Sequence, residues 1–299
     1  MSARDRSTRP ILLLGTDGQV GRALAPRLEA LGSVVALGRA GADLSDPEGL
    51  RPIVRELEPW LVVNAAAYTA VDAAETDEGT CLRVNVDAPA VLAEESAQLG
   101  APIVQYSTNY VFDGLLDRPY REEDVAAPLS VYGQSKLLGE AAVTGNPSHL
   151  ILRLAAVYAS SGRNFMRRIL DLSREREELR VVEDQLVAPT PASAVADATV
   201  GIVGGLLDGT REFRAGVYHL TCAGSTSWYG FAERILALDP HRGEQRAQRV
   251  VPVTSKEFIT PASRPLNGLL DCGRATRELG VTLPDWETEL ERVLADRAT

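Results

Sequence analysis

The chain has few cysteines and histidines and no long apolar run, and each shortage excludes a class of protein. The three cysteines, Cys81, Cys222 and Cys272, form no C-x-x-C motif, and the chain has only three histidines. We therefore expect neither a disulfide framework nor a metal site. No apolar run approaches the roughly 20 residues of a membrane-spanning helix. Residues 1–9 are polar and basic without the apolar stretch of a signal peptide, so we expect a disordered tail there and a cytoplasmic protein.

The chain also has fewer positively charged than negatively charged residues. The chain has 31 lysines and arginines against 41 aspartates and glutamates, a formal net charge of −10. Such a chain offers no broad basic surface, so we expect neither nucleic acid nor a membrane as a partner. A nucleotide ligand needs only a few local cations and remains compatible with this charge. The 299 residues, 45% of them hydrophobic, are enough for one large core or for a large and a small one.

Apolar strand patterns alternate with helix patterns through the first half of the chain. Buried strands are predicted at residues 10–14, 34–37, 61–66, 103–107 and 150–157, and helices at 23–31, 47–57, 81–99 and 132–143. This alternation predicts right-handed βαβ units and an α/β fold with a doubly wound parallel sheet.

The pattern becomes less regular after residue 158. Helices are predicted at residues 164–178, 193–207, 227–238 and 286–295, with strands near Val181 and at 217–221. We therefore divide the chain into a tail (1–9), a dinucleotide-binding domain (10–158) and a smaller, mixed substrate-binding lobe (159–299). Residues of about 192–221 are expected to return to the main sheet.

A glycine-rich turn follows the first predicted strand and precedes the first predicted helix. Its spacing, G-x-x-G-x-x-G, is typical of turns that bind a dinucleotide diphosphate. Glycines let the backbone approach the phosphates, and the free N–H groups at the start of the helix favour an anion. The alternative is a tight turn without a ligand. The candidate cofactor residues here are Gly15, Asp17, Gly18, Gln19, Val20 and Gly21.

Further cofactor residues are expected after the second and third strands. Arg39 suits the 2′-phosphate of NADP, whereas an acidic residue at this place would suit NAD; the alternative is a solvated loop arginine. Asp43 and Leu44 are expected near the adenine. Small residues end the third strand and either let a cofactor lie over the backbone or serve helix–sheet packing. These candidates are Ala65, Ala66, Ala67 and the adjoining Tyr68.

A tyrosine and a lysine four residues apart, Tyr132 and Lys136, predict an acid–base pair. On a helix they lie on one face, one turn apart. A phenol titrates near about pH 10, and a neighbouring ammonium lowers its pKa so that it can exchange a proton near neutral pH. By itself the pair is weak evidence, since it also suits an ordinary surface helix. Thr108, with Ser107 as the alternative, ends the preceding strand and offers a hydroxyl to hold a carbonyl oxygen.

Ordered motifs over almost the whole chain resemble the dTDP-4-dehydrorhamnose reductase family of the extended short-chain dehydrogenases/reductases. They lie at residues 15–21, 63–72, 106–114, 131–136, 184–190 and 264–267. The resemblance implies reduction of a dTDP-linked 4-keto-6-deoxyhexose by NADPH, with NADH as a possible substitute and a homodimer as a possible assembly. It also implies that Tyr132 donates the proton, Lys136 holds the nicotinamide ribose and Thr108 polarises the ketone. Tyr110 would flank the sugar, with Arg264 and Asn267 towards the nucleotide-sugar end.

Three residues depart from the family pattern. Asn109 replaces the aspartate of Ser-Thr-Asp-Tyr, and Val187 replaces the glycine of Asp-Gln-x-Gly. Ala156 stands where rhamnose-forming relatives usually carry a tryptophan beside the sugar. Because these changes fall in the predicted sugar pocket, they favour a related keto-sugar, such as one for a secondary-metabolite (antibiotic) glycoside, as much as rhamnose.

Two other functions remain open from the sequence. A nucleotide-sugar dehydratase or epimerase shares the superfamily, but a dehydratase needs carboxylates after Thr108, where this chain has Asn109 and Tyr110. A non-catalytic NADP-binding regulatory subunit could keep the glycine turn and lose the chemistry. The intact Thr108, Tyr132 and Lys136 argue against that subunit.

Overall fold

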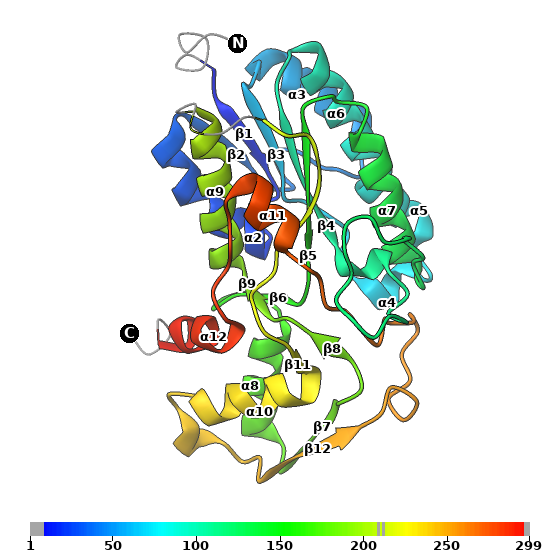
Figure 1. Cartoon of the computed structure of the whole chain (residues 1–299), viewed down its shortest axis with the longest axis vertical. Coiled ribbons are helices and arrows are strands. Elements are labelled where there is room, and N and C mark those ends of the chain that lie inside the picture. The colour runs from blue at the N-terminus through cyan, green and yellow to red at the C-terminus, as the bar shows by residue number, and fades with distance from the viewer. Residues whose placement is uncertain (1–8, 208–209, 211–212, 296–299) are drawn as a thin grey trace.

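The computed structural model describes residues 9–207, 210 and 213–295 and contains a six-stranded parallel sheet (Figure 1). The strand order is β10-β5-β4-β3-β1-β2. The strands are β1 (Ile11–Leu14), β2 (Val34–Leu37), β3 (Leu61–Asn64), β4 (Ile103–Thr108), β5 (His149–Leu154) and β10 (Gly216–His219). The order reverses between β1 and β3, which is where doubly wound sheets bind their ligands. The predicted fold class is confirmed.

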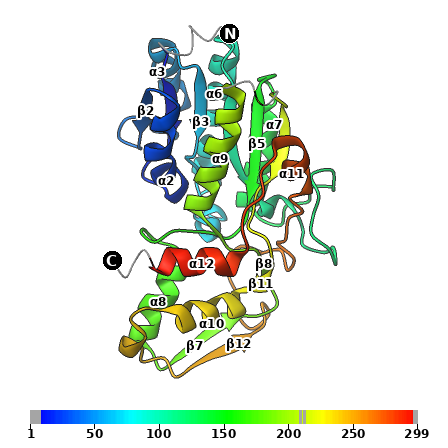
Figure 2. The same cartoon turned by 60° about the vertical axis from the view of Figure 1, so that its left-hand side comes forward.

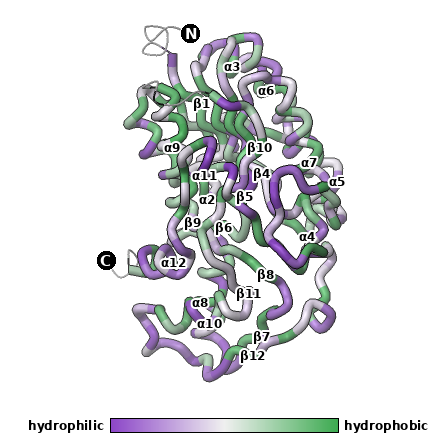
Figure 3. The backbone as a smooth tube through the Cα atoms, in the orientation of Figure 1, coloured by the Kyte–Doolittle hydropathy of each residue, from purple (hydrophilic) through white to green (hydrophobic). Residues whose placement is uncertain are grey.

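Helices cover both faces of this sheet because its central strands are apolar on both sides. In β1, Ile11 and Leu13 pack into one core while Leu12 and Leu14 pack into another. Helices α2 (Gln19–Leu28) and α9 (Ala192–Leu207) cover the first side, and α3 (Leu50–Leu57), α6 (Ala88–Gln98) and α7 (Val131–Val143) cover the second (Figures 1 and 2). The central strands are correspondingly hydrophobic along the traced backbone (Figure 3).

The smaller lobe lies beyond the carboxyl ends of the strands (Figures 1 and 2). It contains α8 (Phe165–Glu175), α10 (Trp228–Leu238) and the parallel pair β7 (Glu178–Val182) and β12 (Arg249–Val253). Side chains cap both helices, since Asn164 accepts the Arg167 N–H and Ser227 accepts the Gly230 N–H. Helix α12 (Trp286–Ala295) lies between this lobe and the sheet domain.

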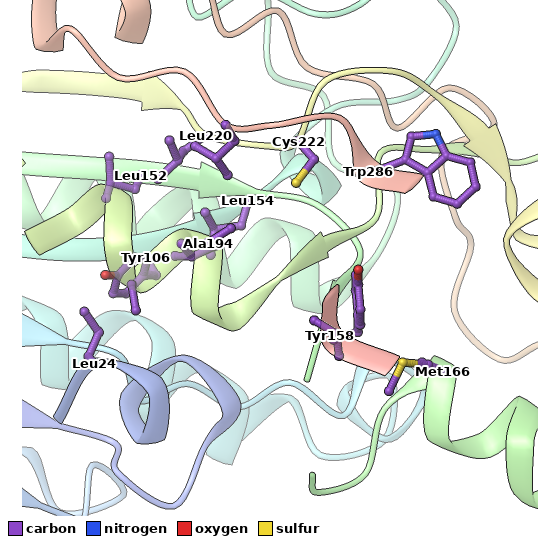
Figure 4. Packing of buried hydrophobic residues seen from close by; sticks show 14 of the residues in the cluster. Leu24, Tyr106, Leu152, Leu154, Tyr158, Met166, Ala194, Leu220, Cys222 and Trp286 are labelled. Carbon is purple, nitrogen blue, oxygen red and sulfur yellow. The ribbon is translucent and has the colours of Figure 1, made fainter. Parts of the chain in front are cut away.

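Short strand pairs join the two parts. Strand β6 (Val157–Tyr158) pairs with β9 (Thr190–Pro191), and β8 (Leu186–Val187) pairs with β11 (Thr226–Ser227). One hydrophobic core then runs from the sheet into the lobe, with Tyr106 and Leu152 at one end and Tyr158, Met166 and Trp286 at the other (Figure 4). This shared core fixes the lobe against the strand ends.

Several helices and strands of the second half of the chain were not predicted from the sequence. These are β12, the helix α11 (Gly273–Leu279) beside β10, and the two-residue strands. Helix α9 packs against α2, and strand β10 pairs with β5 at the edge of the main sheet. The predicted tail lies outside the described residues except for Arg9, whose guanidinium donates to the Glu58 and Pro59 carbonyls. No helix within the described ranges is long and apolar enough to cross a membrane.

Candidate active site

A cavity of about 1430 Å³ separates the carboxyl edge of the sheet from the smaller lobe. The sheet domain contributes the glycine turn, the ends of β3 and β4 and the start of α7. The lobe contributes residues of α8, β7 and the segment after β12. A ligand bound in this cavity would contact both the sheet domain and the smaller lobe.

The glycine turn is built from close backbone contacts. Gly15 has a φ of +89°, and a Cβ there would collide with the backbone of Ala66. A Cβ on Gly21 would collide with the Gly15 carbonyl, so Gly21 lets α2 approach the turn and does not itself line the cavity. The other candidates of this turn line the cavity: Gly15, Asp17, Gly18, Gln19 and Val20.

The end of β2 is fixed to this turn through Asp17. Its carboxylate accepts the Arg39 backbone N–H at 2.8 Å, and a Cβ on Gly38 would overlap the same carboxylate. Arg39, Asp43 and Leu44 line the cavity, and their expected contacts with a cofactor stay predictions. The Ser45 backbone N–H and hydroxyl bind Asp43 and hold the pKa of its carboxyl below the ordinary value.

Asn85 is a structural link that the sequence reasoning missed. It lies in a π-helical turn (Arg83–Asp87), a feature frequent at functional sites. Its side chain accepts the Tyr68 N–H at 2.9 Å and donates to the Tyr68 carbonyl at 3.1 Å and to Ser135 Oγ at 2.9 Å. Asn85 thus ties the segment after β3 to helix α7. A polar residue within an apolar helix pattern was its only sequence signal.

The predicted residues of the segment after β3 divide into two groups. Ala65, Ala66 and Ala67 line the cavity. Tyr68 does not line it; its phenol donates to Asp77 at 3.2 Å, and its backbone is held by Asn85. The structure therefore gives Tyr68 a packing role in place of the expected cofactor contact.

Helix α7 brings Tyr132 and Lys136 to the end of β4. Ser130 caps the helix by accepting the Gly133 N–H. A Cβ on Gly133 would collide with the Tyr110 carbonyl, so this glycine permits the close approach of α7 to the turn (Asn109–Val111) that follows β4. Tyr132, Lys136 and Thr108 all line the cavity.

The protonation of this group differs from the sequence expectation. Burial raises the pKa of Tyr132 above the ordinary phenol value, and hydrogen bonding with Thr108 opposes the rise only in part. Lys136 Nζ donates to the Tyr106 carbonyl at 2.7 Å, and burial lowers its pKa to about 8 against the opposing charge of Glu140. The expected lowering of the Tyr132 pKa by Lys136 is therefore wrong for this structure. The phenol stays protonated at neutral pH, which suits a proton donor.

A buried ion pair lies behind these residues. Glu140 binds Arg153 through two contacts, of 2.8 Å to Nε and 2.6 Å to Nη2, and both side chains are only 6% exposed. Ser107 donates its hydroxyl to the same carboxylate. The hydroxyl that interacts with Tyr132 is that of Thr108, which also donates to Asn109 Oδ1 at 3.3 Å. This placement favours Thr108 over Ser107 as the group that would hold a carbonyl oxygen, and that role stays a prediction.

The predicted substrate-binding residues also divide into those that line the cavity and one that does not. Asn109, Tyr110, Ala156 and Arg264 line the cavity, and Asn267 does not. The Asn267 amide donates to the Leu116 and Arg118 carbonyls at 2.8 and 2.9 Å, so its role here is to hold that loop.

Two departures from the family pattern have visible consequences. The Asn109 amide donates to the Gly268 carbonyl at 3.0 Å, a bond that an aspartate carboxylate cannot donate. Ala156 has a φ of 45°, a strained left-handed conformation for a residue with a Cβ, at the cavity wall. Val187, the third departure, is buried in strand β8 and does not line the cavity.

The lobe side of the cavity carries positive charge. Arg163, Arg168 and Arg176 line it, and within the described part of the chain their side chains form no ion pair or hydrogen bond. Phe165 and Trp228 also line it, with ring centroids 4.5 Å apart. No cluster of three or more His, Cys, Asp or Glu side chains suited to a metal occurs among the described residues.

The family model described as the RmlD substrate binding domain matches residues 9–299. The chain belongs to the dTDP-4-dehydrorhamnose reductase family. A relative with this name from Burkholderia thailandensis is 46% identical over 286 residues, covering 92% of this chain and 95% of the relative. Another from Escherichia coli K12 is 38% identical over 295 residues, covering 97% and 98%.

Solved structures of dTDP-4-dehydrorhamnose reductases have the same fold. The enzyme of Clostridium acetobutylicum superposes with a TM-score of 0.89 at 32% identity, covering 97% of this chain and all of that chain. The enzyme of Bacillus anthracis, crystallised in complex with NADP, gives a TM-score of 0.87 at 28% identity, covering 97% and 99%. These relatives do not favour the dehydratase or epimerase alternative.

Proposed function

We propose that this protein reduces the C4 ketone of a dTDP-4-keto-6-deoxyhexose with NADPH, and that Tyr132 donates the proton. The observation that carries the proposal is the placement of Thr108, Tyr132 and Lys136 in one cavity with the glycine turn, at the carboxyl edge of the sheet. The names of the relatives and the NADP complex of one of them support it.

The cavity residues fit a dinucleotide. Gly15 brings the turn against Ala66 without a side chain between them, which leaves the backbone N–H groups at the start of α2 accessible to a diphosphate. Arg39 reaches the cavity wall beside this turn. When bound, NADPH supplies the hydride that reduces C4.

The protein residues then handle the oxygen and its proton. The Thr108 hydroxyl holds the ketone oxygen, and Tyr132 donates its proton to that oxygen as the carbonyl becomes an alcohol. Burial keeps this proton on the phenol at neutral pH. Lys136 supplies a positive charge behind Tyr132 and hydrogen-bond donors for a cofactor ribose.

The unpaired arginines of the lobe suit the diphosphate of the substrate. Arg163, Arg168 and Arg176 carry charges that no described side chain neutralises, and they line the cavity from α8 and the residues that flank it. Phe165 and Trp228 offer apolar surface for the nucleoside beside them. We infer that the nucleotide end of the substrate occupies the lobe while the sugar faces Tyr132.

Tyr132→Phe should lower turnover by about 10²–10⁴-fold, because the positioned proton donor is removed. NADPH affinity should remain near the wild-type value, as measured by fluorescence titration. Tyr158→Phe is the matched control, since the buried Tyr158 hydroxyl has no hydrogen-bond partner among the described residues. Turnover within a few-fold of wild type in Tyr132→Phe contradicts the assignment.

Arg39→Ala should weaken NADPH binding by about tenfold to a hundredfold, which corresponds to the loss of a charge-assisted contact of about 1.5–3 kcal/mol. NADH, which lacks the 2′-phosphate, should bind the variant and the wild type equally. Equal use of both cofactors by the wild-type protein, unchanged in the variant, would show that Arg39 is only a solvated residue.

Cofactor affinity should depend on the charge of Lys136. Because its pKa is lowered to about 8, Lys136 is protonated at lower pH and loses its charge as the pH rises through that value. NADPH affinity should therefore fall by about tenfold or more between about pH 7 and about pH 9.5. Tyr132→Phe should keep this dependence and Lys136→Met should abolish it. A dependence that persists in Lys136→Met belongs to another group.

We also propose that the space beside Ala156 accepts a 4-keto-6-deoxyhexose with a modified C2 or C3. The wild-type protein should use such an analogue at least as well as dTDP-4-dehydrorhamnose, and Ala156→Trp should shift the ratio of the two kcat/KM values towards the latter. Strain from a bulky residue at a φ of 45° affects both substrates and cancels in the ratio. A clear wild-type preference for dTDP-4-dehydrorhamnose refutes the proposal.

A further inference from the structure

An ion pair joins two distant segments at the wall of the cavity. Asp72 lies in the short helix α4 (Val71–Ala74) of the sheet domain, and Arg264 lies in the segment that returns from the smaller lobe after β12. Arg264 Nη2 is 2.8 Å from Asp72 Oδ2, and Nη1 is 3.0 Å from Oδ1. The Ala262 N–H also donates to Asp72. The pair therefore fastens the lobe segment to the sheet domain through two parallel bonds and a backbone bond.

Both terminal nitrogens of the Arg264 guanidinium form hydrogen bonds within the protein. Besides Asp72, Nη1 donates to Thr260 Oγ1 and to the Ala262 carbonyl. The Arg264 guanidinium is also near the Tyr110 hydroxyl, where it opposes the rise that burial causes in the Tyr110 pKa. This state contrasts with that of Arg163, Arg168 and Arg176, which have no such partners among the described residues. Arg264 is thus poorly suited to bind a phosphate and well suited to hold a neighbouring side chain.

The side chain near Arg264 is Tyr110, which packs against Tyr132. Val71, the neighbour of Asp72 in α4, packs in one cluster with Tyr110 and Tyr132. The rings of Tyr110 and Tyr132 are 5.6 Å apart and meet edge to face at 74°. The Tyr110 backbone N–H donates to Thr108 Oγ1 at 3.2 Å. Tyr110 is therefore in contact with both hydroxyl-bearing residues of the proposed chemistry. A displacement of the Tyr110 ring would remove the packing contact on one side of the Tyr132 ring.

We propose that Asp72 and Arg264 are positioning residues, which hold Tyr110 against Tyr132 and so keep the proton donor aligned with the substrate ketone. This inference rests on the proposed role of Tyr132. The pair acts on the proton-transfer step and leaves the cofactor site, which lies at the glycine turn, unaffected. The Asp72 side chain is 42% exposed and that of Arg264 is 20% exposed, so this ion pair lies at the rim of the cavity and is not part of the buried core. We call the Asp72–Arg264 pair the clamp.

The test compares Asp72→Asn and Arg264→Gln with the wild-type protein. Both variants should lower kcat by about tenfold to a hundredfold, the effect expected from a small misplacement of a reacting group. The KM for the dTDP-keto-sugar and the affinity for NADPH should change by no more than about threefold. Asp72→Glu, which keeps the charge, should restore part of the lost kcat.

Asp124→Asn is the matched control. Asp124 also accepts two bonds from one arginine, Arg118, at 2.7 and 2.8 Å, and one from a backbone N–H, that of Arg121. Neither Asp124 nor Arg118 lines the cavity. Asp124→Asn should leave kcat unchanged while altering thermal stability by an amount similar to Asp72→Asn. Equal losses of kcat in both variants would show a general loss of stability and overturn the proposal.

Direct substrate binding by Arg264 predicts a different pattern. Asp72→Asn would then release the guanidinium and lower the KM for the nucleotide sugar, whereas Arg264→Gln would raise this KM without changing kcat. That pair of opposite effects overturns the clamp.

A double-mutant cycle identifies the intermediary. If the clamp acts through Tyr110, Asp72→Asn should have little further effect on kcat in a Tyr110→Phe background, and independent effects contradict the proposal. Near-normal turnover in Tyr132→Phe refutes the donor role itself. A loss in Tyr132→Phe with normal kcat in Asp72→Asn and Arg264→Gln refutes only the clamp. Should Asp72→Asn fail to fold, Arg264→Gln and Arg264→Lys give the same comparison, since the first removes the charge and should lower kcat while the second keeps the charge and should retain more of it.

Discussion

The candidate site depends on the close packing of helix α7 against the end of strand β4. Gly133 permits it, because a Cβ there would collide with the Tyr110 carbonyl just after β4. Gly139 permits α7 to approach the π-helical turn, because a Cβ there would collide with the Asn85 carbonyl. The packing of α7 against β4 places the Lys136 ammonium on the Tyr106 carbonyl and the Tyr132 phenol beside Thr108. The π-helical turn that carries Asn85 supports this packing, since the Asn85 side chain joins α7 to the segment after β3.

Burial at this contact sets the charges of the site. A buried ammonium and a buried phenol both prefer their neutral forms, so burial alone would leave the lysine without its charge. Glu140, one helical turn after Lys136, opposes that effect, and its own charge is compensated by Arg153 and Ser107. Removing one member would leave an uncompensated buried charge, which is costly. The same helix therefore supplies both the reacting groups and the charge that supports them.

The regular half of the fold was predictable because its signals are local. The apolar runs at β1, β3 and β4 and the glycine turn each occupy a few consecutive residues, and the helices between them show a clear pattern. Strands β8, β11 and β12 were missed, since short strands gain their stability from partners distant in sequence. In the site, Asn85, Glu140 and Asp72 gave little local signal, because their partners are Ser135, Arg153 and Arg264.

The sequence alone determined the family, the fold class and the candidates for chemistry, because each is encoded in residue types at fixed short spacings. Tertiary structure decided how those candidates are used. It occupied Ser107 with Glu140 and left Thr108 beside Tyr132, and it assigned Asn267 to a loop and not to the cavity. It also raised the phenol pKa that the Tyr-Lys spacing had suggested would fall. Burial and hydrogen-bond partners are properties of the packed chain, and no spacing along the sequence specifies them.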